Sequence, residues 1–203
     1  MITFNRKKFF DSYRSRFGPL TQDLVDALEF LLGQIEQDNR FNDSDQDRRQ
    51  LAYCLATFKW ETQHSMRPID EFGSTIYFNK RYGPQTKTGK ILGNIQDGDG
   101  ATFHGRGYVQ LTGRANYTMA GKRFSQELVA EPAQAKQPQL AYQIAIQGMK
   151  EGWFTGKKLD QFIATGKAPE FEKARAIING SDKAQTIADL ARRFDEVLIA
   201  AKL

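Results

Sequence analysis

The chain contains 203 residues, of which 40% are hydrophobic and 26% are charged, and these proportions are ordinary for a globular protein. No apolar run approaches the roughly 20 residues of a membrane-spanning helix, which excludes an integral membrane protein, and the length predicts a single domain over residues 1–203. The formal charge of +5 suits an anionic polymer, such as nucleic acid or an anionic cell wall.

The N-terminal segment Met1–Arg14 contains basic residues without an apolar stretch after them. This is not the pattern of a secretory signal, so we expect synthesis in the cytoplasm. Apolar residues then recur at helical spacing after Thr21, which is placed to cap that helix. After a polar tract, Ser44 or Asp45 can cap a second helix that ends near Glu61.

Glycine is dense between Pro68 and Gly113, where it permits tight turns and a close approach of the backbone to a ligand. We expect a short hairpin within Thr102–Leu111, inside this irregular region. Helical patterns return beyond it and predict helices over 138–153, near 159–163 and over 171–178.

The last helix, which Ser181 can cap, carries an apolar stripe between basic residues. Such a stripe fits either a membrane surface or the core. Acidic residues dilute the positive face, and this favours packing on the core. The helical patterns before Pro68 and after Gly113 therefore predict a mainly α-helical protein.

Two carboxylates lie on either side of the end of the second helix. The apolar face of this helix continues to Glu61, so its carboxyl should point toward the core, where desolvation raises the pKa of an acid. The alternative is a structural ion pair with a basic residue such as Arg67 or Arg106. Glu71 follows Pro68 on a connecting segment, in more water, and should stay ionised.

The segment Gly98–Tyr117 places short polar side chains between glycines. Sugar hydroxyls require amides and hydroxyls at fixed positions, and aromatic rings offer flat faces to a sugar ring. The alternative is a glycine-rich structural turn. The candidate polar groups are Gln110, Thr112 and Asn116, and the candidate rings are Tyr77, Phe103, Tyr108 and Tyr117.

These segments together resemble glycoside hydrolase family 19, which contains chitinases and endolysins. The resemblance rests on Glu61-Thr62, on Glu71-Phe72-Gly73, and on Gly105-Arg-Gly-Tyr-Val-Gln-Leu-Thr112 with Asn116-Tyr117. Further similar segments are Leu92-Gly93-Asn94, Gly152-Trp153-Phe154 and Ile177-Ile178-Asn179-Gly180, so the similarity spans most of residues 51–180. The pattern Phe17-Gly18-Pro19-Leu20 is similar to the endolysin branch.

The resemblance implies a mainly helical, lysozyme-like fold of two lobes, with the small hairpin and the glycine-rich region beside an active-site groove, and an inverting mechanism. Glu61 matches the general acid, Glu71 the general base, and Thr112 the hydroxyl that helps to hold the attacking water. The residues assigned to substrate binding are Arg106, Tyr108, Gln110, Asn116, Tyr117 and Asn179. The family usually has His before the acid, whereas this chain has Trp60, which could reshape the hydrogen bonds around Glu61.

We therefore expect an endolysin-type hydrolase that cleaves β-1,4 glycosidic bonds of bacterial peptidoglycan and acts as a monomer at the cell wall, with possible surface contact with the wall or the outer membrane. The alternatives are a chitinase with the same residues and a carbohydrate-binding relative without turnover. We expect no cofactor and no metal site, because one Cys and two His have no zinc spacing. Nucleic acid is not expected as a partner, since no dense basic stripe with interleaved aromatics is present.

Overall fold

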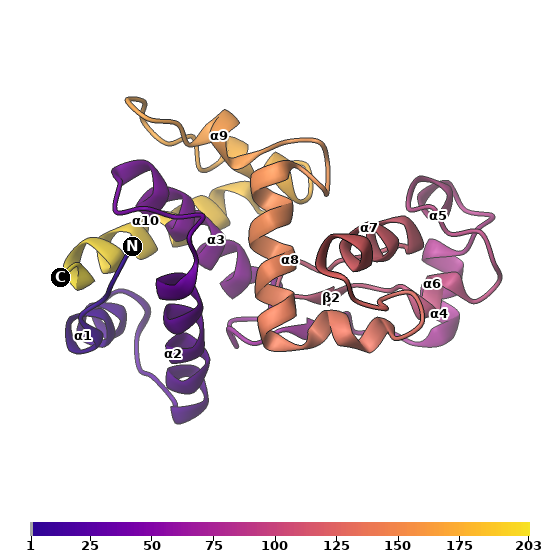
Figure 1. The fold of residues 1–203 in the computed structure, drawn as a ribbon, viewed down its shortest axis with the longest axis horizontal. Coiled ribbons are helices and arrows are strands. Elements are labelled where there is room, and N and C mark those ends of the chain that lie inside the picture. Colours follow the sequence, from indigo (N-terminus) through magenta and orange to yellow (C-terminus); the bar gives the residue numbers. More distant parts are fainter. Residues whose placement is uncertain (1) are drawn as a thin grey trace. The chain divides into compact units, whose positions relative to one another are not determined.

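The computed structural model describes residues 2–203 and is mainly helical, with one small antiparallel sheet (Figure 1). The elements are α1 (Arg6–Phe17), α2 (Gln22–Gln37), α3 (Asp45–Glu61), β1 (Ile69–Asp70), α4 (Thr75–Tyr82), α5 (Lys87–Ile91), α6 (Asp99–Thr102), β2 (Arg106–Gly107), α7 (Arg114–Phe124), η1 (Pro132–Lys136), α8 (Pro138–Glu151), α9 (Leu159–Phe162), η2 (Lys173–Ile177) and α10 (Ala184–Ala201). Within residues 2–203, no helix combines the length and the apolarity that a membrane span needs.

The chain divides into two compact units. Unit 1 contains Met1–Met66 and Ile146–Leu203, and unit 2 contains Arg67–Ala145. Unit 1 therefore combines both ends of the chain, whereas unit 2 is a continuous segment. The prediction of a single domain over residues 1–203 stays a prediction.

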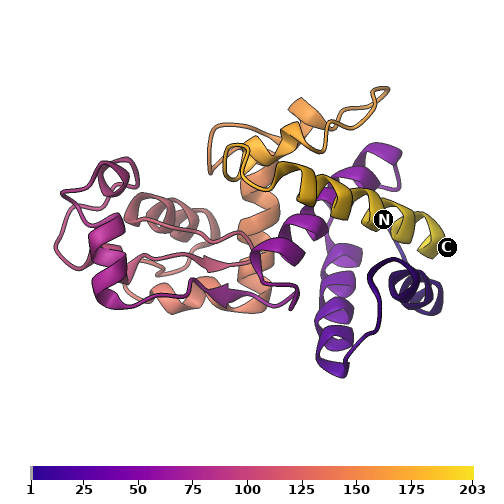
Figure 2. The same cartoon turned by 180° about the vertical axis from the view of Figure 1, so that it is seen from behind.

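Helix α10 organises unit 1, because it packs against both α3 and α1. Its apolar stripe is buried, with Phe194 fully enclosed beside Tyr13 and Phe17 of α1. The prediction that the last helix packs on the core is thus confirmed. The amide of Asn5 donates to the carbonyl of Ala201 at 2.8 Å, and Figure 2 shows the two termini at the same side of unit 1.

Of the three predicted helix caps, two are present in the structure and one is not. The hydroxyls of Thr21 and Ser44 accept hydrogen bonds from the first turns of α2 and α3, as expected. Ser181 does not cap the last helix, since α10 begins at Ala184 after Lys183, which has a φ of 58°. The helix predicted over 171–178 is a shorter 3₁₀ helix, η2.

Unit 2 is arranged around the two-stranded sheet, in which Asp70 of β1 lies opposite Arg106 of β2. The hairpin predicted within residues 102–111 is reduced to one bridge between Arg106 and Leu111. The turn between them is formed by residues 107–110, in which Gly107 and Gln110 have positive φ values of 90° and 56°. Strand β2 therefore pairs mainly with β1, directly before Glu71.

Candidate functional site

The carboxylate of Glu71 is held by two donors from different parts of unit 2. The hydroxyl of Tyr82 in α4 donates to Oε1 at 2.8 Å, and the amide of Gly105 donates to Oε2 at 3.1 Å. The Glu71 amide in turn donates to the Gly105 carbonyl at 2.7 Å. The chain after β1 is thus fixed to the start of the segment Gly105–Thr112.

Two features keep this arrangement in place. A Cβ atom at Gly105 would lie 2.8 Å from Oε1 of Gln110 and 3.1 Å from Oε2 of Glu71, so any larger residue would displace the Gln110 amide and crowd the carboxylate. Burial, together with the Glu71 carboxylate, raises the pKa of Tyr82 to about 12. The Tyr82 hydroxyl therefore remains a donor over the range in which proteins normally work.

Asp70, the neighbour of Glu71, is committed to ion pairs. Arg106 lies 3.1 Å from Oδ1, Lys136 binds Oδ2, and Nε2 of His104 lies 3.5 Å from Oδ1. Partial burial acts to raise the pKa of Asp70, but the hydrogen bond and charge of Lys136 and the charges of Arg106 and His104 outweigh it and hold this pKa below its ordinary value. The ion pairs of Asp70 therefore hold β1 in place. Its neighbour Glu71 is the carboxylate that contacts the glycine-rich segment, through the amide of Gly105.

The predicted polar residues of this segment form a chain of hydrogen bonds. The amide group of Gln110 donates to the Gly107 carbonyl at 3.2 Å, the hydroxyl of Thr112 to the Gln110 carbonyl at 2.8 Å, and the amide group of Asn116 to the Thr112 carbonyl at 2.7 Å. All three side chains are half-buried. The structure thus brings Gln110, Thr112 and Asn116 together in unit 2, where they fix the backbone.

Three of the rings predicted to face a sugar lie in the core instead. Phe103, Tyr108 and Tyr117 are each no more than 1% exposed, so the prediction that they stack on a sugar ring is wrong. The hydroxyl of Tyr117 donates to the His104 carbonyl and accepts from Arg106, both at 2.9 Å. Sequence spacing alone does not separate a buried tyrosine with hydrogen-bond partners from an exposed one.

Arg106 has a structural role as well. Its side chain is 11% exposed, and its guanidinium group donates to Asp70, Tyr117 and the Thr102 carbonyl. The predicted contact between Arg106 and a substrate is therefore replaced by contacts within unit 2. Tyr77, at 42% exposed, is the predicted ring that does present a surface.

Glu61 lies at the end of α3 in unit 1 and forms an ion pair. Nη1 of Arg175 donates to Oε1 of Glu61 at 2.5 Å, and the side chains of Arg175 and Glu61 are 2% and 17% exposed. The Glu61 carboxyl is thus mostly enclosed, as expected, but it is paired with a cation, so the ion-pair alternative is correct with a different partner from Arg67 or Arg106. By volume, Arg175 is the largest of the fully buried side chains in residues 2–203.

Arg175 connects Glu61 to the segment that follows η2. Its Nε donates to the Asp182 carbonyl at 2.8 Å, and its own carbonyl accepts from the amide of Asn179 at 3.0 Å. Asn179 is exposed, so its side chain is available to a ligand at this part of unit 1. Trp60, which replaces the usual family His, contacts His64 edge-on and lies 6.0 Å from Nζ of Lys183.

Sequence reasoning missed Arg175 and Tyr82. One signal existed for Arg175, because it is a single charge within the otherwise apolar run Ala174–Ile178, and a charge in such a run needs a partner. No comparable signal marks Tyr82, whose bond to Glu71 depends on how α4 folds back.

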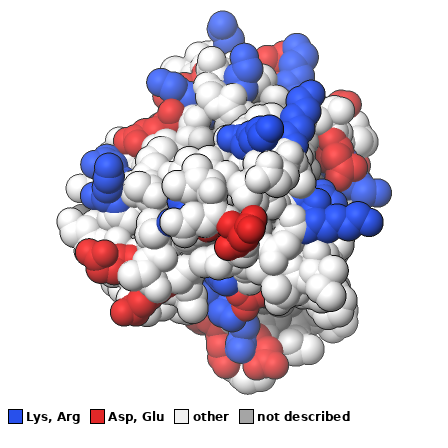
Figure 3. All heavy atoms as spheres, turned by 90° about the vertical axis from the view of Figure 1, so that its right-hand side faces the viewer, with Lys and Arg blue, Asp and Glu red and all other residues white. Residues whose placement is uncertain are grey.

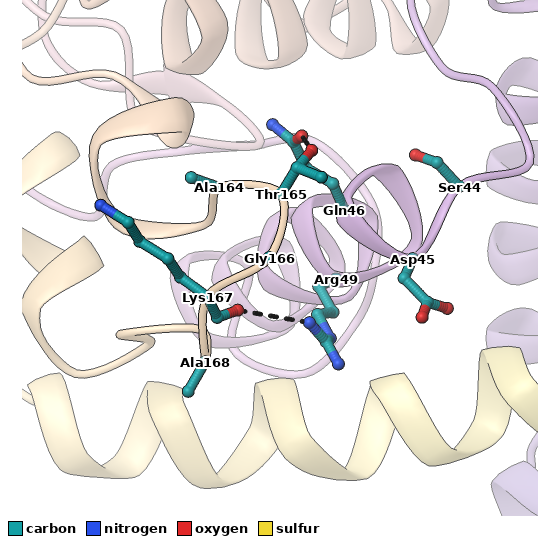
Figure 4. Close-up of a pocket in the computed structure, with 9 residues that line it drawn as sticks. All are labelled: Ser44, Asp45, Gln46, Arg49, Ala164, Thr165, Gly166, Lys167 and Ala168. Carbon is teal, nitrogen blue, oxygen red and sulfur yellow. Dashed lines mark hydrogen bonds between the residues drawn. The ribbon is translucent and has the colours of Figure 1, made fainter.

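Unit 1 also has an open hollow of about 450 Å³ between the start of α3 and the loop 164–168 (Figure 4). Arg49 and Lys167 lie beside it, and the guanidinium group of Arg49 donates to the Lys167 carbonyl at 3.4 Å. The hollow contains none of the predicted site residues.

The family model and the similar solved structures point to the same family. The family model for class I chitinases, which is glycoside hydrolase family 19, matches residues 38–182. Chitinase C of Streptomyces griseus has a similar structure, with a TM-score of 0.61 and 21% identity, over 96% of this chain and 91% of that one. A second bacterial family 19 chitinase gives a TM-score of 0.63 and 19% identity, over 96% and 94%. No curated protein sequence matches the chain.

Proposed function

Since the chain belongs to glycoside hydrolase family 19 and is therefore a glycoside hydrolase, we propose that it cleaves β-1,4 glycosidic bonds between the aminosugars of bacterial peptidoglycan. The fold is the mainly helical, lysozyme-like fold of family 19 chitinases, with a small two-stranded sheet. Membership of the family establishes the class of reaction, which is hydrolysis of a glycosidic bond. The substrate and the residue roles below are our proposal.

In the proposed reaction, Glu61 protonates the oxygen of the leaving sugar while Glu71 removes a proton from the attacking water. An inverting hydrolase needs one carboxylic acid and one carboxylate on opposite faces of the sugar, with space for water. Thr112 and Asn116 would orient this water, and Gln110 and Asn179 would support substrate binding.

One observation carries the assignment of Glu71 as the base. Its carboxylate binds the amide of Gly105, the first residue of the segment Gly105–Thr112 that resembles the family signature. A carboxylate held by the Tyr82 hydroxyl and by a backbone amide has a fixed orientation, which general-base catalysis requires. The Glu61–Arg175 contact provides a comparable restraint for the acid.

The charge of the chain supports peptidoglycan as the substrate. The net charge is +5, and bacterial walls carry carboxylates on their peptides and anionic polymers that would attract it. The N-terminal pattern Phe17–Leu20, similar to endolysins, supports the same substrate. Chitin is the second candidate, because the similar solved structures are chitinases.

Product analysis distinguishes the two substrates. The protein would be incubated separately with purified peptidoglycan and with chitin oligosaccharides, and the fragments identified by mass analysis of their new reducing ends. We expect faster release from peptidoglycan than from chitin, at an aminosugar reducing end, and release by Glu71→Gln that is at least about 100-fold slower. Equal or faster hydrolysis of the chitin oligosaccharides would reassign the protein as a chitinase.

A further inference from the structure

The segment Phe72–Gln96, which contains α4 and α5 of unit 2, exposes large apolar side chains to solvent. Phe72, Ile76, Ile91 and Ile95 are 95%, 80%, 75% and 71% exposed, respectively. Only one other large apolar side chain in residues 2–203, that of the C-terminal Leu203, reaches 70% exposure. Three isoleucines and one phenylalanine so exposed on one short segment distinguish it from the rest of the described surface, and exposed apolar groups that gather in one place are typical of a binding surface.

The same segment carries positive charge without any negative charge. Lys80, Arg81, Lys87 and Lys90 are all exposed, and no Asp or Glu occurs between Phe72 and Gln96. Figure 3, which looks onto the part of unit 2 with α4, α5 and α6, shows broad uncharged areas with Lys and Arg side chains next to them and an acidic patch near the middle. We name the exposed part of residues 72–96 the α4–α5 surface.

A firm backbone supports these side chains. The amide group of Asn94 donates to the Tyr82 carbonyl at 2.7 Å, and the Thr86 hydroxyl donates to the Gly83 carbonyl at 2.9 Å. Gly89 packs so closely that a Cβ atom would lie 2.0 Å from the Gly83 carbonyl oxygen. These backbone contacts therefore fix helices α4 and α5 against each other.

We propose that the α4–α5 surface binds an anionic lipid surface, with the isoleucine side chains inserted among the acyl chains and the basic side chains at the phosphate groups. Interfacial binding uses this combination of aliphatic groups and cations. It goes beyond the glycosidase activity, because it would place the enzyme at a membrane that borders its wall substrate.

The other partners fit less well. A polysaccharide is bound through aromatic faces and hydrogen-bonding groups. Phe72 and Tyr77 offer aromatic faces, but Ile76, Ile91 and Ile95 offer neither and would stay uncovered. A second copy of this chain would bring two cationic surfaces together, which like-charge repulsion opposes. A lipid surface with negative headgroups satisfies both the aliphatic and the cationic groups.

Sedimentation with vesicles tests the proposal on the full chain. We expect binding to vesicles that contain phosphatidylglycerol and at least about tenfold weaker binding to pure phosphatidylcholine vesicles. Lys87→Gln with Lys90→Gln should weaken binding about 25-fold, at about fivefold for each cation. Ile91→Ser with Ile95→Ser should weaken it at least about tenfold, since each loses apolar contact with the lipid.

Matched variants outside the surface serve as controls. Ile199→Ser removes a side chain that is 53% exposed on α10, and Lys158→Gln removes an exposed cation; both should bind vesicles as the wild type does. Hydrolysis of soluble peptidoglycan fragments should be unchanged in all of these variants, which separates this proposal from the proposed function. Absence of vesicle binding, equal binding to both lipids, or equal losses in the controls would overturn the proposal. The same would follow if the Ile91 and Ile95 changes weakened binding to polysaccharide or self-association instead.

Discussion

At the scale of the residue, the hydrogen bond from Tyr82 to Glu71 is a feature that the structure shows and that the sequence did not predict. Tyr82→Phe removes the donor to Oε1 of Glu71 but keeps the ring. A hydrogen bond to a charged group contributes about 1.5–3 kcal/mol, so we expect kcat to fall about tenfold or more with little change in KM. Tyr77→Phe, which loses a hydroxyl bound to Arg81, is the matched control and should keep full activity in the same kinetic assay.

Arg175 gives a second prediction at this scale. Arg175→Met leaves the Glu61 carboxylate, 17% exposed, without its cation, and removal of one partner of a buried pair costs about 3–5 kcal/mol. We expect a loss near the lower end of this range in urea unfolding, because Glu61 keeps some contact with water. In Glu61→Gln the same Arg175 change should cost clearly less. Equal costs in both backgrounds would mean that the two side chains are not coupled.

At the scale of the element, Asp99 joins α6 to the start of α7. Its carboxylate accepts from Arg114 and from the amides of Ile95 and Gln96. The Arg114 hydrogen bond is the main cause that lowers the pKa of Asp99 from 3.8 to about 2. A lowered pKa adds stability that is complete above pH 4 and is lost as the pH falls toward 2.

Asp99→Asn should therefore lower the free energy of unfolding by about 2 kcal/mol at pH 7. The difference from the wild type should shrink between pH 4 and pH 2, as followed by urea unfolding at a series of pH values. Asp97→Asn, at an exposed position, is the control. A difference between the wild type and Asp99→Asn that stayed constant to pH 2 would show that the ion pair adds no stability.

Lys59 of α3 is a buried cation that faces α1. Its Nζ donates to the Tyr13 hydroxyl at 2.8 Å and lies 5.2 Å from the ring centre of Phe17. Desolvation by burial lowers the pKa of Lys59, so its charged form destabilises the folded chain at any pH below that lowered value.

Lys59→Met should raise the free energy of unfolding at pH 7 by about 1 kcal/mol, because an apolar side chain of similar length avoids the cost of burying the charge. The advantage should diminish as the pH rises toward the ordinary value for lysine. Thermal and urea unfolding would measure it, with Lys7→Met, whose side chain is 87% exposed, as the control. A less stable Lys59→Met would indicate that the Tyr13 contact outweighs the desolvation.

At the scale of the whole molecule, local signals predicted the elements well. The caps Thr21 and Ser44, the Pro138 start and the buried face of α10 depend on neighbours along the chain. The failures depend on distant neighbours. Arg175 reaches Glu61 across 114 positions, and burial of Tyr108 depends on packing within unit 2, so no local pattern identifies the partner of Arg175 or the burial of Tyr108.

The candidate site was predictable only in part for the same reason. The resemblance supplied Glu61, Glu71 and Thr112 as candidates, but it did not reveal which side chains hold them. Tyr82 and Arg175 entered only from the structure.

The central claim, that Glu61 and Glu71 are the acid and the base of a peptidoglycan hydrolase, is tested most directly by the rate of hydrolysis of purified peptidoglycan. The rate would be measured for Glu61→Gln and Glu71→Gln, with folding checked by circular dichroism and with the exposed Glu127→Gln as the control. General acid–base catalysis contributes about 10²–10⁴-fold, so each folded variant should be at least about 100-fold slower while Glu127→Gln remains at the wild-type rate. A folded Glu61→Gln protein that kept more than about a tenth of the wild-type rate, well outside that range, would contradict the assignment of the acid.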